Sequence, residues 1–268
     1  MRNLRTLGKQ LFHSPLSCSL SFLLSLSLTA GFGNVVRAES PTTAPPELKE
    51  IIEEIENASN NRDLKELMQF YSREYTNSDG LTHSALSDAL KAMWRRYYRL
   101  KYRTELLSWE RVGEQLVAET VTSIRGIKRE QGRLIRLNST IRSRQYFQNQ
   151  KLVRQEILAE RNKLTSGKNP PQVEVKLPEK VRVGEQFNFD VIVKQPLGDD
   201  LLLGTAMEEK TSGDLYLNPS TLELDLLAAG GIFKLVKAPL IADNRWFSAI
   251  LVREDGITLI TQRVIIEE

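Results

Sequence analysis

The feature that most constrains the fold is a stretch of alternating residues between Leu100 and Glu160. Its most regular part is the run Arg133 to Phe147, in which apolar or small side chains alternate with arginines and other polar side chains. One set is Ile135, Leu137, Ser139, Ile141, Ser143 and Phe147, and the other is Arg136, Asn138, Thr140, Arg142, Arg144 and Tyr146. A period of two is the side-chain period of a β-strand. Because a slip of one residue would bury the arginines, the sequence predicts a strand of firm register.

Three more strands are predicted in the same stretch. Residues 102–107 alternate, and Gln115 to Arg125 is rich in Val, Thr and Ile, which suit a pleated and half-buried surface. Lys151 to Glu160 alternates again after the polar turn Gln148 to Gln150. The connections are short, so the four strands are predicted to form an antiparallel meander.

The first 38 residues have the pattern of a signal peptide. Arg2, Arg5 and Lys9 precede a run of Leu, Ser and Phe from Leu16 to Phe32, and small residues flank Arg37 at Val36 and Ala38. The alternative is an uncleaved anchor, but serines dilute the run, which falls short of the ~20 apolar residues a span needs. We therefore expect cleavage after Ala38 and export to the periplasm or outside the cell, or to the thylakoid lumen if the source is photosynthetic.

Processing changes both the cysteine content and the charge. The only cysteine, Cys18, lies in the predicted signal peptide, so the mature chain would form no disulfide and no cysteine-based metal site. Of 37 basic residues four lie in the first 38, which leaves 33 against 34 acidic residues. The pI of about 8.9 is therefore due largely to the basic residues of the signal peptide. Since the mature chain would not be basic overall, nucleic acid is not an expected partner.

Helices are predicted before the strands. Residues 39–46 read as a flexible lead-in with three prolines, and apolar residues recur at helical spacing from Glu47 to Ala58. Asp63 and Glu66 resemble a capping box that begins a short second helix. A third amphipathic helix is predicted from Ser84 to Arg99.

This order of elements resembles the nuclear transport factor 2-like (SnoaL-like, ketosteroid isomerase-like) superfamily over residues 47–164. The likeness is carried by the run Arg62 to Tyr75, by Leu86 to Tyr98 as the third helix, and by the long strand Arg133 to Phe147. The resemblance implies an α+β cone of three helices on a curved antiparallel sheet, often with a pocket and often dimeric through the sheet. It is specific for the fold and not for an activity.

The C-terminal part has a different composition. Residues 165–172 read as a linker, and residues 173–268 contain short strands and turns typical of a β-sandwich. The expected strands are 173–177, 181–183, 187–193, 201–207, 215–217, 222–227, 232–236, 246–253 and 257–266. The segment Leu177 to Phe187 resembles the opening of an immunoglobulin-like domain of exported bacterial proteins. The expected fold is therefore an α+β cone followed by an all-β immunoglobulin-like sandwich.

Five aromatic residues are the candidates for a ligand pocket in the cone: Tyr71, Tyr75, Trp94, Tyr98 and Trp109. The alternative is that they fill the core, since aromatic residues at helical or strand spacing are usually buried.

Catalytic candidates are weaker. Asp79, Glu105 and Glu119 could face inward, but Asp79 also fits a turn before Gly80, and the two glutamates lie among arginines that could pair with them across strands. His83 is the single histidine of the predicted mature chain, and it cannot complete an ordinary metal site by itself. Gly-rich phosphate loops are also absent from the sequence. No metal is therefore predicted, because His83 stands alone, and no cofactor is predicted, because no phosphate-binding motif occurs.

The sequence thus favours an exported, non-catalytic binding or interaction protein over an enzyme, because no acid is matched with a base. Its partner would be a small apolar ligand or another protein, and the basic and aromatic run Arg95 to Arg103 leaves an anionic headgroup, a glycan or an acidic protein open. One alternative is a small-molecule isomerase, dehydratase or hydrolase that uses Tyr71 or Tyr75 with Asp79 or Glu105. Another is a structural homodimer through the arginine-bearing sheet face.

Cleavage after Ala38 predicts that the mature protein begins at Glu39. Edman degradation of the protein purified from its native source should therefore read Glu-Ser-Pro from the first cycle. A protein that retains Met1 would contradict export by a cleaved signal peptide.

Overall fold

The computed structural model describes residues 38–268 except positions 197, 199, 219, 222, 228 and 255. Residues 1–37 of the predicted signal peptide, which include Cys18, lie outside the described residues, and only its last residue, Ala38, is described. No helix in the described ranges is both long enough and apolar enough to cross a membrane.

The helices form where the sequence places their buried faces and caps. They are η1 (Pro41–Thr43), α1 (Pro46–Asn61), α2 (Leu64–Leu67), η2 (Met68–Phe70) and α3 (His83–Arg96). Arg62, with a left-handed φ of 57°, ends α1, and the Asp63 carboxylate then accepts the Glu66 backbone N–H at 2.9 Å. That bond is the N-terminal half of the predicted capping box. The third helix ends three residues earlier than predicted, since Tyr97 already belongs to the next strand.

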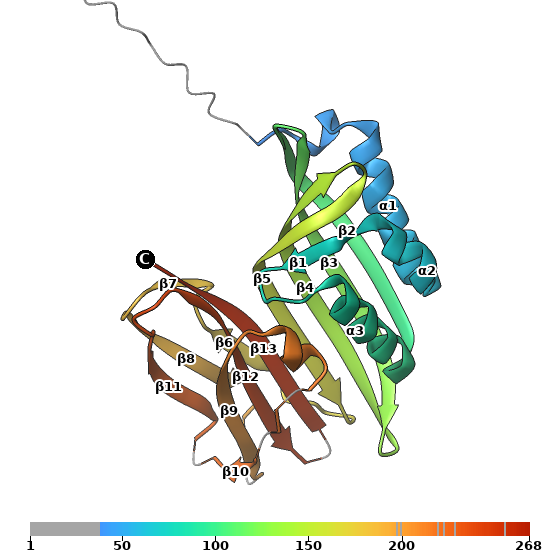
Figure 1. Cartoon of the computed structure of the whole chain (residues 1–268). Coiled ribbons are helices and arrows are strands. Elements are labelled where there is room, and N and C mark those ends of the chain that lie inside the picture. Colours follow the sequence, from blue (N-terminus) through green and yellow to red (C-terminus); the bar gives the residue numbers. More distant parts are fainter. Residues whose placement is uncertain are drawn as a thin grey trace, which may run out of the picture. The chain divides into compact units, whose positions relative to one another are not determined.

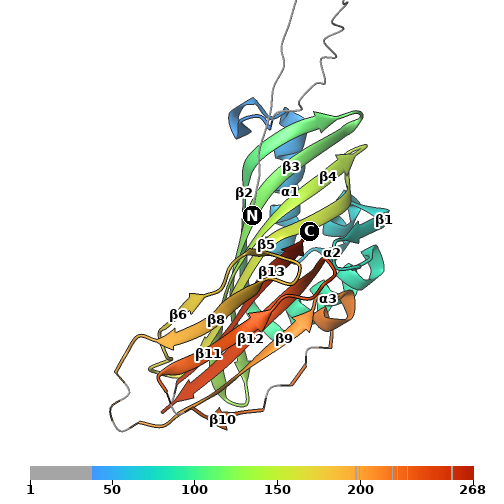
Figure 2. The same cartoon turned by 90° about the vertical axis from the view of Figure 1, so that its left-hand side faces the viewer.

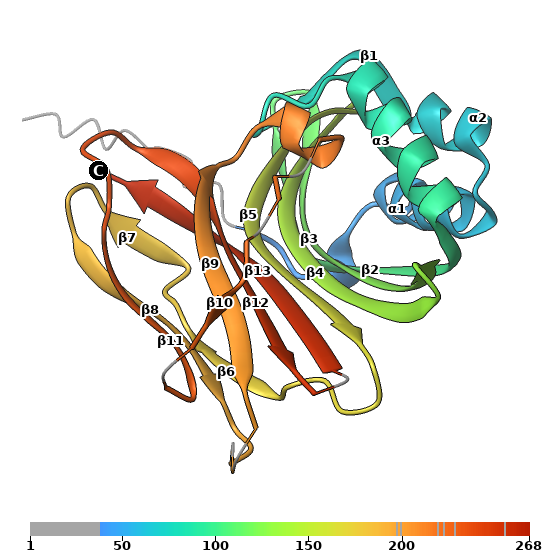
Figure 3. The same cartoon turned by 90° about the horizontal axis from the view of Figure 1, so that it is seen from below.

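Four long strands form the predicted meander. These are β2 (Tyr97–Val112), β3 (Gln115–Glu130), β4 (Arg133–Gln148) and β5 (Lys151–Ser166), each antiparallel to the next. Asn149 and Gln150 both have positive φ, which matches the right-handed twist at a two-residue hairpin. The short strand β1 (Tyr71–Asn77) pairs with β5 in parallel. The sheet β2–β5 curves, and the three α-helices cover its concave face (Figures 1 and 3).

The arginine-bearing face of this sheet is the outer one. Leu137, Ser139, Ser143 and Phe147 of β4 are buried, as the alternation predicts. On the opposite face, the Glu119 carboxylate accepts the Nε–H of Arg142 at 2.6 Å, while Arg154 and Glu156 lie 2.8 Å apart. The expected cross-strand pairing of Glu119 is therefore confirmed.

The C-terminal part is all β apart from one turn of helix. Its elements are β6 (Val173–Lys176), β7 (Lys180–Arg182), β8 (Gln186–Val193), β9 (Leu202–Lys210), η3 (Gly213–Tyr216), β10 (Asp225–Leu226), β11 (Gly231–Lys237), β12 (Asp243–Arg253) and β13 (Gly256–Glu267). The strand expected at residues 215–217 is wrong, because Leu215 and Tyr216 belong to η3. The Asp214 carbonyl accepts the N–H groups of Leu217 and Asn218, so this segment forms its backbone hydrogen bonds locally and not with a neighbouring strand.

Two sheets pack against one another here. The three-stranded sheet β11-β8-β6 faces β9, β12 and β13, as Figures 2 and 3 together show. Phe247 of β12 meets Phe187 and Phe189 of β8 edge to face, with ring centroids 5.6 and 5.4 Å apart. Val191 and Val264 are fully buried in the same core. The fold is therefore mostly antiparallel sheet with three α-helices, and its C-terminal part is a two-layered sandwich.

One sheet continues through both parts of the chain. β13 pairs antiparallel with β5 from Ile257 opposite Ser166 to Gln262 opposite Arg161. Within the described residues this makes a ten-stranded sheet in which β13 joins the sandwich to the meander. The predicted start of the linker at residue 165 falls inside β5, and Gly167, with φ of +90°, follows the strand end.

A buried ion cluster lies where these strands meet. The Arg263 guanidinium, on β13, donates to both oxygens of Asp79 at 2.7 Å and to Glu160 Oε2, on β5, at 2.9 Å. The side chains of Arg263 and Asp79 are 0% exposed and that of Glu160 is 8% exposed. Tyr216 donates its hydroxyl proton to Asp79 at 2.7 Å, and Trp246 donates its indole N–H to Glu160 at 2.8 Å. Every carboxylate of the cluster is thus held by several donors.

Replacing Arg263 with methionine should lower the free energy of unfolding by about 3–5 kcal/mol, because two buried carboxylates would lose their cation. Urea denaturation of the mature protein measures this change. Arg161→Met is the matched control on β5: Arg161 is 61% exposed and pairs with Glu179 at the surface, so its loss should cost below about 1 kcal/mol. Equal losses in the two variants would contradict the role of the buried cluster.

Candidate functional site

An inner cavity of about 180 Å³ lies between α1, α3 and the concave face of the sheet. Its apolar wall is formed by Ile52, Ile55, Leu67, Leu86, Leu90, Ile124 and Ile141. Its polar lining is formed by Glu56, Ser59, Tyr71, Tyr102, Thr104, Thr122, Gln145 and Gln155. Apolar walls with a few convergent polar groups are typical of small-molecule sites. This volume suits a ligand of only a few non-hydrogen atoms.

Tyr71 lines the cavity and Tyr75 supports it. The two rings meet edge to face with centroids 5.0 Å apart. Tyr75 donates its hydroxyl proton to Gln155 Oε1 at 2.8 Å, and the amide nitrogen of Gln155 donates to Ser143 at 3.1 Å. Burial raises the pKa of Tyr71 to about 12, so its hydroxyl stays protonated and can donate a hydrogen bond. Burial also raises the pKa of Tyr75 well above the usual value.

Trp94 reaches the cavity through a neighbour. Its indole N–H donates to the Tyr102 hydroxyl at 3.0 Å, and that hydroxyl points its own proton at the Met93 sulfur, 3.8 Å away. Tyr102 lines the cavity, and burial raises its pKa. Trp94 therefore orients a lining residue without lining the cavity itself.

Trp109 and Tyr98, the other two predicted pocket residues, lie elsewhere. Trp109 is buried against Leu48 and Phe147, and its indole N–H donates to Thr43 at 3.1 Å. Its backbone pairs with Glu39, whose N–H donates to the Trp109 carbonyl at 2.7 Å. Tyr98 is 53% exposed at the start of β2, because the helix ends before it and the strand turns it outward.

Glu56 is a lining residue that the sequence analysis missed. Its carboxylate accepts the backbone N–H of Thr104 at 2.6 Å and faces the same cavity as the tyrosines. A signal was present, because Glu56 follows Ile52 by four residues and therefore lies on the buried face of α1. Glu56 was overlooked because it follows closely after Glu53 and Glu54, which are exposed.

None of the three predicted carboxylates lines the inner cavity. Glu105 is 60% exposed and lies 3.4 Å from Arg103, and Glu119 pairs with Arg142 outside the sheet. Asp79 belongs to the buried cluster. Burial alone would raise the pKa of Asp79, but the hydrogen bonds and charge of Arg263, with hydrogen bonds from Tyr216 and Thr211, hold it below the usual value. Asp79 is thus an ionised structural group and a poor proton acceptor.

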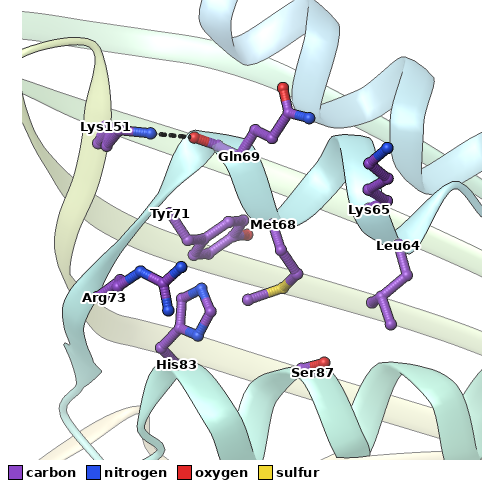
Figure 4. Close-up of a pocket in the computed structure, with 9 residues that line it drawn as sticks. All are labelled: Leu64, Lys65, Met68, Gln69, Tyr71, Arg73, His83, Ser87 and Lys151. Atoms are coloured by element: carbon purple, nitrogen blue, oxygen red, sulfur yellow. Dashed lines mark hydrogen bonds between the residues drawn. The ribbon is translucent and has the colours of Figure 1, made fainter.

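A second hollow opens on the outer side of Tyr71. This α2–α3 cleft has a volume of about 700 Å³ and is lined by Leu64, Lys65, Met68, Gln69, Tyr71, Arg73, His83, Ser87 and Lys151. Figure 4 shows the Arg73 guanidinium beside the His83 ring, with the Tyr71 ring and the Met68 side chain behind them. His83 is the first residue of α3, one residue before the predicted start of that helix. Tyr71 lines both hollows.

Neither hollow offers a ready metal centre. Across residues 38–268, apart from the six undescribed positions, no group of three or more His, Cys, Asp and Glu side chains could hold an ion. The inner cavity can bind a small molecule, because it offers hydroxyl and amide hydrogen bonds and one carboxylate within an apolar wall.

Comparisons with known proteins give one family model and a set of similar solved structures. Residues 168–267 match the model of a domain of unknown function (DUF8623). A search of curated proteins gives no match.

Similar solved structures cover about 41% of the chain. Bd1075 of Bdellovibrio bacteriovorus has 17% identity and a TM-score of 0.31, over 41% of this chain and 38% of its own length. A putative scytalone dehydratase from Novosphingobium aromaticivorans has 11% identity and a TM-score of 0.36, over 41% of this chain and 80% of its own. A nuclear transport factor 2-like protein from Burkholderia xenovorans has 14% identity and a TM-score of 0.29, over 42% of this chain and 89% of its own.

The lowered pKa of Asp79 predicts a pH dependence. A carboxylate with a depressed pKa stabilises the fold above its unfolded pKa of about 3.9 and loses that contribution as pH falls through the folded value. Asp79→Asn should therefore cost roughly 2–3 kcal/mol at pH 7, and the gap to the wild type should shrink below about pH 4.

Urea unfolding at several pH values measures the gap. Asp88→Asn is the control, since Asp88 is 58% exposed and pairs only with Lys91 at the surface. A gap for Asp79→Asn that stays constant between pH 7 and the acid limit would contradict the prediction.

Proposed function

We propose that this protein is an exported, non-catalytic binding module that holds a small, largely apolar ligand in its inner cavity. The observation that carries the proposal is the cavity itself, in which Tyr71, Tyr102 and Gln155 direct polar groups into an apolar wall. A ligand with one polar group, such as a hydroxyl or carbonyl, could hydrogen-bond to one of these groups and bury its remaining surface against the apolar wall.

The fold assignment belongs to the same proposal. Three helices on the concave face of a four-stranded meander support a nuclear transport factor 2-like cone for residues 47–164. The two packed sheets of residues 173–268 support an immunoglobulin-like sandwich. Export is proposed from the sequence of the first 38 residues alone. The pairing of Glu39 with Trp109 is compatible with cleavage after Ala38, since the new terminal nitrogen could still donate to that carbonyl.

A non-catalytic role is supported by the lining. Among its described residues the cavity has one carboxylate, Glu56, and no histidine. The Glu56 carboxylate already accepts the backbone N–H of Thr104, which gives it a structural role between α1 and β2. General acid–base catalysis needs two groups matched to opposite tasks, and the described lining offers one carboxylate without a histidine or second carboxylate beside it.

A second candidate function rests on the same carboxylate. Glu56 shares the cavity with Tyr71 and Tyr102, whose raised pKa values keep their hydroxyls protonated. In an isomerase, a dehydratase or a hydrolase, Glu56 would take a proton while a tyrosine donated a hydrogen bond to a developing oxyanion. This arrangement replaces the pairing of Tyr71 or Tyr75 with Asp79 or Glu105.

Binding in the inner cavity can be tested with 4-fluorophenol, a small aromatic ring with one hydroxyl, followed by ¹⁹F NMR. We expect saturable binding to the mature protein and its loss in Ile141→Phe, which fills the cavity from β4. Val112→Phe, at an exposed position, should bind like the wild type. Unchanged binding in Ile141→Phe would refute the inner cavity as the site.

Catalysis is tested by incubating an extract of the native source with the mature protein and comparing its small molecules by mass spectrometry. The binding role predicts that components are retained by the protein and none is converted. Conversion by the wild type but not by Glu56→Gln would establish the enzyme instead.

A further inference from the structure

The α2–α3 cleft is positively charged without compensation from its own lining. Lys65, Arg73 and Lys151 are cationic side chains and His83 adds an imidazole, whereas none of the nine lining residues is Asp or Glu. These residues come from α2, β1, α3 and β5, so only the fold brings them together. Like charges gathered at one concave surface repel each other, and a bound anion would remove that repulsion.

Several cations on the outer face of the sheet, by contrast, are paired with carboxylates. On the outer sheet face Arg142, Arg144 and Arg154 each lie within 4.0 Å of a glutamate. Among the residues that the structure describes, Lys65 and Arg73 form no such pair. Lys151 donates one proton to the Gln69 carbonyl at 2.6 Å, and its ammonium has two further protons to offer.

The floor of the cleft is apolar. Figure 4 shows the Met68 side chain and the Tyr71 ring between Arg73 and Leu64, with Ser87 at the edge of α3. The Arg73 guanidinium and the His83 ring lie side by side next to this floor. A guanidinium beside an apolar surface suits a planar or tetrahedral oxyanion that carries a hydrocarbon part.

We propose that the α2–α3 cleft is a second binding site, which takes a small organic anion: a carboxylate or phosphate joined to a short apolar chain. Arg73 and Lys151 hold the oxyanion, His83 and Ser87 offer further hydrogen-bond donors, and Met68 and Tyr71 contact the chain. This site is distinct from the one proposed in the inner cavity, although Tyr71 lines both hollows.

The methionines allow both sites to be observed in one experiment. Met68 lines the cleft, Met93 contacts the Tyr102 hydroxyl beside the inner cavity, and Met207 lies in a hollow next to Trp246. We would record methyl NMR spectra of ¹³C-methyl-methionine mature protein, assigned with Met68→Leu, during titration with hexanoate, hexyl phosphate, inorganic phosphate and the neutral hexanol.

We expect hexanoate and hexyl phosphate to shift the Met68 methyl in a saturable way and to leave Met207 unmoved. Arg73→Gln and Lys151→Gln should each weaken binding about tenfold, as loss of one charge-assisted hydrogen bond predicts. Lys176→Gln, an exposed cation on β6, is the matched control and should bind like the wild type.

Equal affinity for hexanol, or unchanged affinity in both Arg73→Gln and Lys151→Gln, would overturn the anion site. Inorganic phosphate that binds as tightly as hexyl phosphate would overturn the role of the apolar floor. A shift of Met93 without Met68 would place the ligand in the inner cavity and refute the cleft. Binding of 4-fluorophenol is tested separately, so either proposal can fail while the other stands.

Discussion

The contact between Arg263 and two buried carboxylates is the interaction on which the rest of the structure depends. Arg263 lies on β13, Asp79 in the turn before α3, and Glu160 on β5, so one guanidinium joins three segments that are far apart in sequence. One cation faces two carboxylates, and the donors from Tyr216, Trp246 and Asn162 spread the excess negative charge. Buried ions of this kind are tolerated only when their hydrogen bonds are nearly complete.

The cluster also sets the geometry of both hollows. Asp79 precedes Thr82, which caps α3, and α3 supplies Leu86 and Leu90 to the inner cavity and His83 and Ser87 to the α2–α3 cleft. Anchoring this turn to β13 therefore fixes where α3 begins. Tyr71 then separates the two hollows, with its ring packed on Tyr75 and its hydroxyl kept protonated by burial. A small apolar ligand inside and an organic anion outside would contact the same tyrosine.

Several predictions of local structure follow directly from the sequence because their causes are local. The arginine face of β4, the cap at Asp63 and the hairpin at Asn149 depend on neighbours in the chain or one strand away. The site was harder to predict. Tyr71 was identified, but Tyr98 points outward because α3 ends before it, and Glu56 was overlooked although its spacing from Ile52 placed it on the buried face.

By itself the sequence determined the elements and the buried faces, since period two and period 3.6 record which side chains must avoid water. Only the tertiary structure decided what Asp79 does and where the sheet ends. Asp79 looked like a turn residue or a catalytic acid until Arg263, 184 residues later, was found to hold it. Likewise, the sheet formed by the stretch from Leu100 to Glu160 continues into the sandwich, because β13 pairs with β5. No local pattern could predict either, because hydrogen bonds between distant strands and a buried ion cluster depend on partners that the chain brings together only on folding.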